Sequence, residues 1–432
     1  MHDDDRSNRI APAQWWALAL LGLVYTLHTI DRNIISAVVE PIKHEFQLSD
    51  RAVGALSGMA HSVAFALAVL PLGWLVDRVN RTRLLAGLLA LWSGLTALSG
   101  LAGSYVGLLL ARFGVGAAEA GSSPACMSLI SDIFPAGRRA SAIGIFYLST
   151  AIGTGLVFLL GSRFAQEFGW RSLFFAAGVP GVILALVMGF ALKEPRRGGP
   201  DGSASTPQAG FADVKRHIAT THTVLYLCAG ITLAAMLMAS LWTWTSSFLI
   251  RLHGLDLKQA GLIVGIVSGG CQAVGAAIAG PVADRISRGI PGRLAWVPTV
   301  MMSIAACAGL GMVFADSLAV SVGCAGVMAF MLGGWLGPGY GLMLTVTPTQ
   351  MRGRVTAASQ LVTNLVGIGL GPLITGAVSD LLGGGDALRS ALAVTMLIGL
   401  ASAAMFAMAA RSAGADLVRL NGSSVSPGLA MR

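Results

Sequence analysis

Charged residues are scarce in this sequence. Asp, Glu, Lys and Arg make up 11% of its 432 residues, against roughly 25% in an ordinary soluble domain, whereas 55% of the residues are hydrophobic. A soluble chain of this length would form two or three cores, and too few charges are present to cover their surfaces. The scarcity excludes an ordinary soluble protein and favours a chain that is solvated by lipid.

Cysteine is also rare, and its spacing carries no metal-binding or disulfide pattern. The five cysteines lie singly within apolar runs, at Cys126, Cys228, Cys271, Cys307 and Cys324. No CxxC or Cys/His pair has the spacing of metal ligands, so we expect no disulfide framework, no metal site and no cofactor.

Motifs of energy-coupling and hydrolytic enzymes are missing as well. The four lysines (Lys43, Lys193, Lys215 and Lys258) lie outside any G-x-x-x-x-G-K-[ST] loop, and neither HExxH nor a strand–helix GxSxG occurs. ATP-driven transport is therefore unsupported, and we expect no enzyme activity.

The chain nevertheless carries a formal net charge of +9. Its basic residues sit in short connections between apolar runs, as expected where positive charge is retained in cytoplasmic loops. We therefore expect a lipid bilayer, and not a nucleic acid, as the partner of this charge.

Long apolar runs dominate the sequence, and a membrane-spanning helix needs about 20 such residues. Six runs precede residue 193 and six follow residue 221, which predicts an all-α membrane protein of two six-helix bundles (1–192 and 222–411). Residues 193–221 read as a cytoplasmic linker with a surface helix near Phe211–Ile218, and 412–432 as a cytoplasmic tail. The predicted spans are 14–42, 52–77, 84–103, 105–133, 140–165, 171–192, 222–250, 258–284, 293–315, 317–347, 354–381 and 386–411.

The orientation follows from the distribution of Lys and Arg. Of the 29 Lys and Arg residues, Arg32 and Arg112 fall within spans, and twenty lie on the side that holds both ends of the chain. By the positive-inside rule that side is cytoplasmic, which predicts a multi-pass protein of the inner membrane with both termini inside. The opposite side holds only seven: Lys43, Arg51, Arg163, Arg171, Arg251, Lys258 and Arg389.

Loop motifs recur in the two halves. GWLVDRVNRTR (Gly73–Arg83) is matched by GPVADRISR (Gly280–Arg288), and PAGRRA (Pro135–Ala140) by PTQMRGRV (Pro348–Val355). The chain is therefore a doubled unit.

The acids of the first motif pair, Asp77 and Asp284, each close a helix at its C-terminal end, where the helix dipole disfavours a carboxylate. Each acid needs a nearby Arg or the N-terminus of a neighbouring helix as a partner. Gly73 and Gly280 are expected to allow backbones to approach closely.

These motifs resemble the G-x-L-a-D-R-x-G-R-[KR] signature of the major facilitator superfamily. Asn80 replaces the second glycine of that signature. The resemblance implies two bundles that rock about a central cavity, with a cytoplasmic gate formed by Gly73, Asp77, Arg78, Arg81, Asp284 and Arg285. The alternative is that these charges serve topology alone. The matching residues are Gly73, Leu75, Asp77, Arg78, Arg81 and Arg83.

Three segments resemble the spinster branch of that superfamily, which includes proton-linked carriers of lysophospholipids and sphingoid lipids. The Asp–Arg pair of the first segment also occurs in organic anion:cation symporters. Gly153 and Gly155 lack the proline typical of antiporters, which weakens a drug-antiporter interpretation. The segments are Asp31–Ile42, Ala111–Ala125 and Asp132–Val157.

Ionisable residues at bilayer depth are the sharpest functional signal, because each is costly there. The first half holds four of them, together with His28 and His61. Arg112, Gly116, Glu119 and Ser123 follow one face of a helix, and His28 lies one turn from Asp31. The four are Asp31, Arg32, Arg112 and Glu119.

The cluster predicts a proton-coupling site. Low dielectric favours the neutral form of a carboxylic acid and a nearby Arg favours its charged form, so we expect Asp31 and Glu119 to carry protons and Arg112 to tune them. His28 fits a proton relay and a satisfied core histidine equally well, and we include it in the coupling site. The sequence does not choose between the two acids. A permanent Asp31–Arg112 ion pair is the structural alternative. Arg32 fits a packing role equally well, and His61 is interpreted as structural.

The second half holds no ionisable residue away from its helix ends. A cavity with one charged and one apolar wall suits an amphipathic substrate. Trp244 and Trp335 are further aromatic candidates, but aromatic residues in membrane helices often only pack. The substrate-binding residues that we predict are Ser123, Trp242, Gln272, Tyr340 and Asn364.

The sequence thus predicts a monomeric, proton-coupled secondary transporter of an amphipathic lipid-like or organic-anion substrate, working by alternating access. The alternatives are a proton symporter of a small organic acid, an uncoupled facilitator or channel, and an intramembrane enzyme or receptor.

Overall fold

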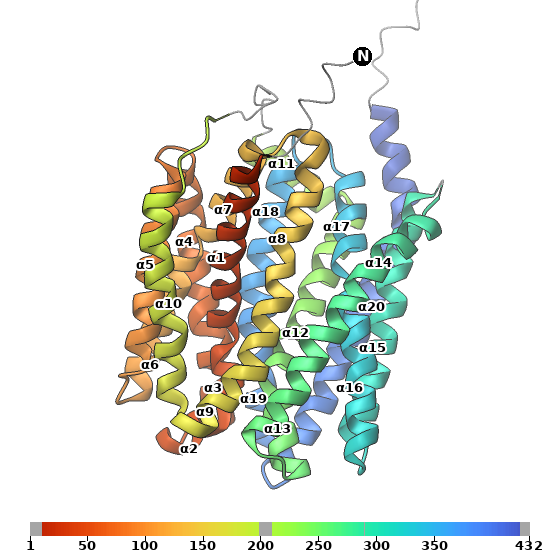
Figure 1. Cartoon of the computed structure of the whole chain (residues 1–432). Coiled ribbons are helices and arrows are strands. Elements are labelled where there is room, and N and C mark those ends of the chain that lie inside the picture. The colour runs from red at the N-terminus through yellow and green to blue at the C-terminus, as the bar shows by residue number, and fades with distance from the viewer. Residues whose placement is uncertain (1–10, 198–209, 289, 424–432) are drawn as a thin grey trace, which may run out of the picture. The chain divides into compact units, whose positions relative to one another are not determined.

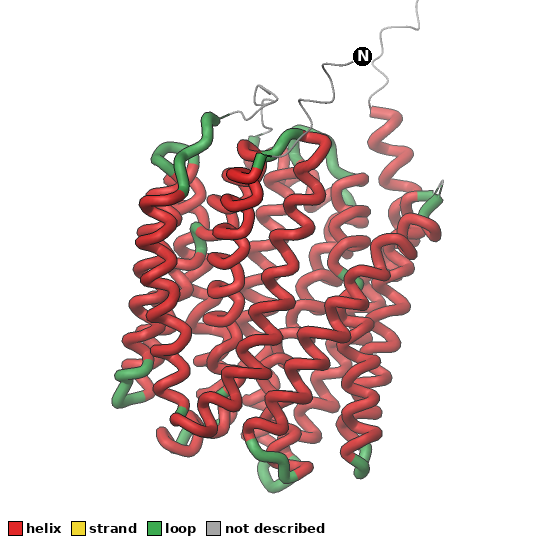
Figure 2. The backbone as a smooth tube through the Cα atoms, viewed as in Figure 1, coloured by secondary structure: helices red, strands yellow, loops and turns green. Residues whose placement is uncertain are grey.

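A computed structural model describes residues 11–197, 210–288 and 290–423 of the chain. Within these ranges the secondary structure is helical throughout and contains no strand (Figure 2). Each of the twelve predicted spans corresponds to a helical segment, and several segments consist of two or three helices in series (Figure 1).

The first six segments are separated by short turns and one short helix, α2 (Val39–Phe46). They are α1 (Pro12–Ala37), α3–η1–α4 (Asp50–Gly54, Ala55–Met59, Ala60–Val76), α5 (Arg81–Ser99), α6–α7 (Tyr105–Glu119, Ser122–Ile133), α8–η2–α9 (Ala136–Leu156, Val157–Gly161, Ser162–Phe168) and α10 (Trp170–Ala191).

A surface helix, α11 (Phe211–Thr220), precedes the second six segments and confirms the helix predicted in the linker. The segments are α12 (His222–His253), α13–η3–α14 (Leu257–Val264, Gly265–Cys271, Gln272–Ile286), η4–α15 (Pro291–Ala295, Trp296–Phe314), α16–α17 (Leu318–Gly333, Leu336–Thr345), α18–η5–α19 (Arg352–Val362, Thr363–Ile368, Gly369–Leu382) and α20 (Ala387–Ser423).

Among the described residues, ten helices are long and apolar enough to cross a membrane. The two remaining segments are α1 and α6–α7. Helix α1 carries His28, Asp31 and Arg32, and the other segment is interrupted between Glu119 and Ser122. These two segments are therefore the ones that carry the charges predicted at bilayer depth, Asp31, Arg32, Arg112 and Glu119.

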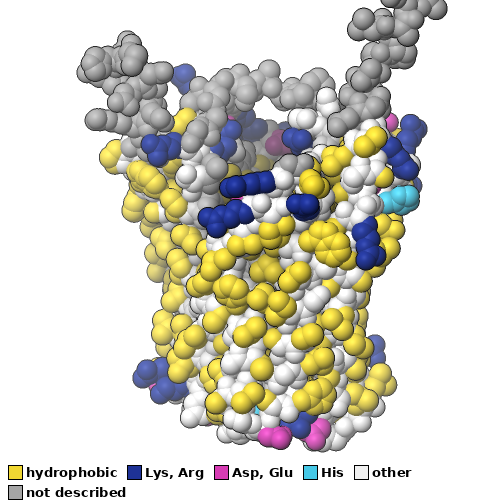
Figure 3. Space-filling model, turned by 90° about the vertical axis from the view of Figure 1, so that its right-hand side faces the viewer, with side chains coloured by type: hydrophobic (Ala, Val, Ile, Leu, Met, Phe, Trp, Pro, Cys, Tyr) yellow, Lys and Arg dark blue, Asp and Glu magenta, His cyan; other side chains and the backbone are white. Residues whose placement is uncertain are grey.

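The outer surfaces of the helices are apolar. Large hydrophobic side chains such as Phe190, Leu381 and Leu67 are largely exposed, and hydrophobic side chains cover most of the face in Figure 3, with Lys and Arg gathered near one end. Exposed apolar surface of this extent marks contact with lipid.

The same pairs of helices cross in the two halves. Spans 1 and 5, 2 and 4, and 3 and 6 pack together in the first half, and spans 7 and 11, 8 and 10, and 9 and 12 in the second. At each crossing a glycine faces a partner so closely that an added Cβ would collide with it. The glycines are Gly153, Gly116, Gly178, Gly367, Gly333 and Gly309. The doubling predicted from the loop motifs therefore extends to helix packing.

A second repeated feature is a stretch of π-helix. It occurs in spans 2, 5, 8 and 11 as η1, η2, η3 and η5. A π-helical turn shifts the side chains that follow it around the helix axis and is frequent at functional sites.

Contacts divide the chain into two units, and the division does not follow the predicted bundle boundary. One unit comprises Met1–Ser205 and Trp242–Gly269, and the other Thr206–Leu241 and Gly270–Arg432. The segment Trp242–Gly269 joins the first unit because α13 packs against η2 and α9. At the C-terminal end, α20 continues through Ser423, so the predicted tail at 412–432 begins as helix.

Candidate functional site

The predicted cluster of buried charges lies in the first unit, on helices α1 and α6. Asp31 and Arg112 are each 1% exposed and Glu119 is fully buried. Helix α6 begins at Tyr105, where the side chain of Ser104 caps its first turn. From that start, the i and i+7 spacing places Arg112 and Glu119 on one face.

Arg112 approaches Asp31 through the backbone and not through the carboxylate. Its Nη2 donates a hydrogen bond of 2.8 Å to the carbonyl oxygen of Asp31. Within the described part of the chain the two side chains form no ion pair, and Nε and Nη1 of Arg112 and Oδ1 of Asp31 have no hydrogen-bond partner. The geometry therefore differs from a permanent ion pair between these two side chains.

Glu119 lies between two imidazoles. Its Oε2 is 3.3 Å from Nδ1 of His28 and 3.5 Å from Nε2 of His61, yet neither contact has the geometry of a hydrogen bond. Nδ1 of His28 also lies 3.5 Å from the Ser122 hydroxyl. Arg32, which follows Asp31 on α1, interacts electrostatically with Glu119. The structure thus brings all four predicted proton-coupling residues together and adds His61 and Arg32.

The cluster combines buried groups that are able to bind protons. Buried polar groups are hydrogen-bonded in the great majority of cases, so orphaned ones ask for an explanation. The cluster contains two carboxyls, two imidazoles and a guanidinium, and their side chains form no hydrogen bonds with one another. Such a group of atoms can accept a proton or a polar ligand without first breaking a hydrogen bond.

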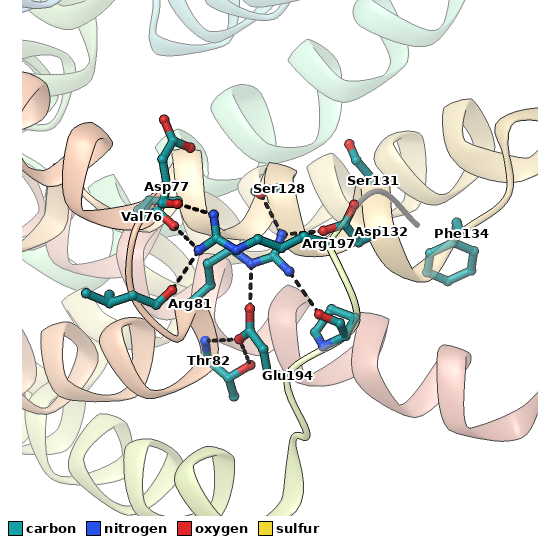
Figure 4. A network of polar contacts seen from close by, with 12 residues as sticks. Val76, Asp77, Arg81, Thr82, Ser128, Ser131, Asp132, Phe134, Glu194 and Arg197 are labelled. Atoms are coloured by element: carbon teal, nitrogen blue, oxygen red, sulfur yellow. Dashed lines mark hydrogen bonds and ion pairs between the residues drawn. The ribbon is translucent and has the colours of Figure 1, made fainter. Parts of the chain in front are cut away.

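A second buried arginine, Arg81, lies at the predicted cytoplasmic end of the same unit (Figure 4). It is 2% exposed and every guanidinium nitrogen has a partner. Nε donates to Glu194 at 2.7 Å, Nη1 to Ser128 at 2.8 Å and to Asp132, and Nη2 to the carbonyl of Pro195 at 3.1 Å. This network joins the start of α5 to α7 and to the chain after α10.

Glu194 completes this network by capping helix α5. Its Oε2 accepts hydrogen bonds from the backbone amide and the hydroxyl of Thr82, at 3.0 and 3.1 Å. Burial opposes ionisation, but the Thr82 amide and the Arg81 guanidinium hold the pKa of Glu194 below its usual value. The carboxylate is therefore charged at neutral pH.

The predicted gate acid, Asp77, caps the C-terminal end of α4. Its backbone carbonyl, with those of Val76 and Val79, accepts hydrogen bonds from Arg197, so that this arginine offsets the negative end of the helix. Figure 4 shows the Asp77 carboxylate pointing away from Arg81 and Arg197. The nearby Arg that the sequence led us to expect thus binds the backbone of Asp77.

The other predicted gate residues are placed as follows. Arg78 stacks on the ring of Trp74, 3.9 Å from its centroid, and Asp284 and Arg285 are exposed in the last turn of α14. A Cβ built on Gly73 or on Gly280 meets no atom within 4 Å. Neither glycine is therefore required for a close approach of backbones within its own unit.

An ion cluster at the opposite end of the first unit was missed by sequence reasoning. Arg251, at the end of α12, binds Asp50 through two hydrogen bonds of 2.9 Å and Glu40 through a third of 2.9 Å. Lys43 forms an ion pair with the same Asp50, which is only 3% exposed. Charges at a predicted membrane surface are ordinary, so their pairing across distant segments is visible only in the fold.

The predicted substrate-binding residues are spread over both units. Ser123 on α7 and Trp242 on α12 belong to the first, and both are half-buried. In the second, Gln272 donates to Sδ of Met238 at 3.3 Å, and Asn364 to the carbonyl of Gln360 at 2.9 Å on its own helix. Tyr340 lies half-buried on α17. The role of these five residues in substrate binding stays a prediction.

Comparison with known proteins gives one family for most of the chain. Residues 21–372 match the Major Facilitator Superfamily. An MFS-type efflux pump of Mycolicibacterium smegmatis is 30% identical over 387 residues, which cover 88% of this chain and 87% of that protein. Protein spinster homolog 1 of Homo sapiens is 30% identical over 54% of this chain, and the match spans 45% of the human protein.

A solved structure extends the likeness over nearly the whole fold. It is a bacterial homolog of the human lysosomal transporter Spinster, described as inward-facing and unoccupied. It is 27% identical, covers 94% of this chain and 98% of that one, and superposes with a TM-score of 0.86. The chain belongs to the major facilitator superfamily of membrane transporters and, within it, is similar to the spinster proteins.

Proposed function

We propose that this transporter is a proton-coupled secondary carrier of an amphipathic, lipid-like or organic-anion substrate. It works by alternating access in the inner membrane, with both termini in the cytoplasm. One observation carries the proposal: Asp31, Arg112 and Glu119 are almost completely buried, and five of their polar side-chain atoms have no hydrogen-bond partner. A structural cluster would satisfy those atoms, because unpaired buried polar groups cost about 1–3 kcal/mol each.

Proton coupling accounts for this arrangement. Protonation of a carboxyl removes a charge from the low-dielectric interior. Release of the proton restores the negative charge and its attraction to Arg112. The two states favour different arrangements of the helices that carry the groups, which is the requirement for linking proton binding to a conformational change.

The asymmetry of the two halves supports the substrate class. The crossing of α4 and α6 places His61 beside Gly116, with Glu119 in the next turn. The corresponding crossing of α14 and α16 places Gln272 beside Gly333 and is followed by Leu336. The crossing in the first half thus carries ionisable groups and the corresponding crossing in the second half does not, and this asymmetry favours a molecule with a polar head and an apolar body.

Arg112 favours a second candidate, a small organic acid. Nε and Nη1 of its guanidinium are buried and unpaired, and a planar guanidinium with two free donors matches a carboxylate. In this version the substrate carboxylate binds Arg112 while a proton occupies Glu119 or Asp31.

The test is transport in proteoliposomes with an imposed pH gradient. The probe is chosen by a thermal-shift screen of lysolipids, sphingoid bases and organic acids. We expect flux that follows the gradient and stops responding to it in Asp31→Asn or Glu119→Gln. Flux in the unmutated protein that ignores the gradient would contradict proton coupling and favour a facilitator.

A further inference from the structure

His61 lies in the interior with neither ring nitrogen hydrogen-bonded. It is 3% exposed, and both Nδ1 and Nε2 lack a partner among the described residues. A neutral histidine has one nitrogen that donates and one that accepts, and in a core each normally finds a partner. His61 therefore does not have the environment of a histidine that is kept for packing.

Two features of the backbone bring this side chain to Glu119. The π-helical turn η1 (Ala55–Met59) ends just before His61 and sets the face on which it emerges. Gly116 lies one turn before Glu119, and a Cβ there would stand 2.4 Å from the carbonyl oxygen of His61. Only glycine allows α4 and α6 to approach so closely at this level.

The carboxyl of Glu119 is thereby held between imidazoles from two different helices. The same oxygen, Oε2, is 3.3 Å from His28 on α1 and 3.5 Å from His61 on α4. Both separations are slightly longer than a good hydrogen bond, so a shift of a few tenths of an ångström makes either one. The carboxyl can form one hydrogen bond without breaking another.

We propose that His61 and His28 are the two proton-exchange partners of Glu119. In the exchange step the O–H bond at Oε2 breaks and an N–H bond forms at Nε2 of His61 or Nδ1 of His28. The step leaves a carboxylate beside an imidazolium, and the reverse step restores the neutral pair. His61 thus acts on the proton and not on the substrate.

The charges around the cluster suit one exchangeable proton. With both acids ionised, the charges of Arg32 and Arg112 balance those of Asp31 and Glu119, so an added proton leaves a single net positive charge for the group to share. The titratable or charged side chains that face Glu119, directly or through a neighbour, are Tyr25, His28, Asp31 and Arg32 on α1, His61 on α4, Arg112 on α6, Cys126 on α7 and Tyr147 on α8.

This inference deepens the proposed coupling site, but its test does not require transport. Infrared difference spectra of the protein in lipid nanodiscs, recorded against pH, report the carbonyl band of a protonated carboxyl. The band of Glu119 is the one that Glu119→Gln removes. We expect its midpoint in His61→Gln to move by about one pH unit or more, which is a tenfold change in proton affinity.

The matched control is His217→Gln. His217 on α11 is also buried, but its Nδ1 lies 3.2 Å from the hydroxyl of Thr221 and it is remote in sequence from the cluster. We expect this variant to leave the Glu119 midpoint unchanged. An unchanged midpoint in His61→Gln as well would overturn the proposal.

A second measurement covers the case in which His61→Gln does not fold. Protein with ¹⁵N-labelled imidazoles is titrated by NMR, and two histidines should change protonation together with Glu119 and lose that link in Glu119→Gln. Histidines that titrate identically with and without the carboxyl would overturn the proposal. If flux does not respond to a pH gradient but the titration midpoint of Glu119 still depends on His61, the proposed proton exchange is supported and the proposed coupling to transport is contradicted.

Discussion

Two arginines in the first unit are equally buried and differ in how they are satisfied. Arg81 is 2% exposed and each of its nitrogens is hydrogen-bonded. Arg112 is 1% exposed, and only Nη2 is bonded. Burial and charge are the same, so they do not distinguish Arg81, which we predict at the cytoplasmic gate, from Arg112, which we propose acts in proton coupling. The separation lies in the partners: the Arg81 network is complete, whereas the Arg112 cluster leaves atoms free for a proton or a ligand.

The largest expected effect is the loss of Arg81. Arg81→Ala leaves Asp132 and Glu194 without their common partner. Breaking a fully buried ion pair costs about 3–5 kcal/mol, and partial exposure of the two carboxylates lowers the cost here. We expect a marked fall in thermal stability in detergent. Arg83→Ala, at an exposed position in the same helical turn, is the control and should change little. Equal stability of the two variants would show that the network does not hold α5, α7 and Glu194 together.

Replacement of Arg112 should lower transport strongly and stability only modestly. Arg112→Gln removes one charge-assisted hydrogen bond, to the carbonyl of Asp31, for a stability cost of about 1.5–3 kcal/mol. Gradient-driven transport should fall by at least about tenfold, since the charge next to both acids is lost. Thermal unfolding and flux measured on the same preparation test this. A variant that is as unstable as Arg81→Ala but transports normally would reverse the assignment of the two arginines.

The ion cluster at the opposite end sharpens the comparison, because it is complete and yet joins distant segments. Arg251→Gln removes both hydrogen bonds that the guanidinium donates to the buried Asp50. If alternating access opens this end, the variant should favour the open state, and a cysteine placed at an exposed position on α2 should react faster with a membrane-impermeant thiol reagent. Glu40→Gln, which removes the charge of one ion pair but keeps an oxygen that can accept the Arg251 hydrogen bond, is the milder control. Unchanged labelling would exclude a gating role for the cluster.

The smallest expected effect is a pH dependence of stability. The pKa of Glu194 is held below its usual value, so its stabilising contribution is present above the pKa of the unfolded chain and is lost as the pH falls through the lowered value. Thermal stability should therefore decline in acid, and less steeply in Glu194→Gln. Parallel curves of thermal stability against pH for the two proteins would show that Glu194 does not cause the decline in acid.

Much of the fold was predictable because lipid imposes long apolar runs. The spans and the linker helix at Phe211–Thr220 follow from composition. The interruption between Glu119 and Ser122 and the π-helical turns were not foreseen, since they depend on how neighbouring helices pack. Helix α20 extends past the predicted boundary at 411. An apolar run marks where a chain lies in the membrane, whereas a helix ends where its backbone hydrogen bonds end.

The site was predictable where residues share a helix face. The spacing of Arg112 and Glu119, and of His28 and Asp31, brought four residues to one place. Partners from distant segments were not predictable. Glu194, for example, lies 113 residues from Arg81. His61 was interpreted as structural because sequence does not show whether a buried ring nitrogen has a partner. Gly116, one turn before Glu119, was the available signal of a close helix crossing.

The most direct test of the account compares two matched substitutions in gradient-driven flux. Glu119→Gln changes the incomplete cluster and Glu194→Gln changes the complete one, with the same change of side chain. Flux per folded molecule in proteoliposomes should lose its response to the pH gradient in Glu119→Gln and keep it in Glu194→Gln. An equal loss in both variants, or a full response in both, would contradict the division between a functional and a structural cluster.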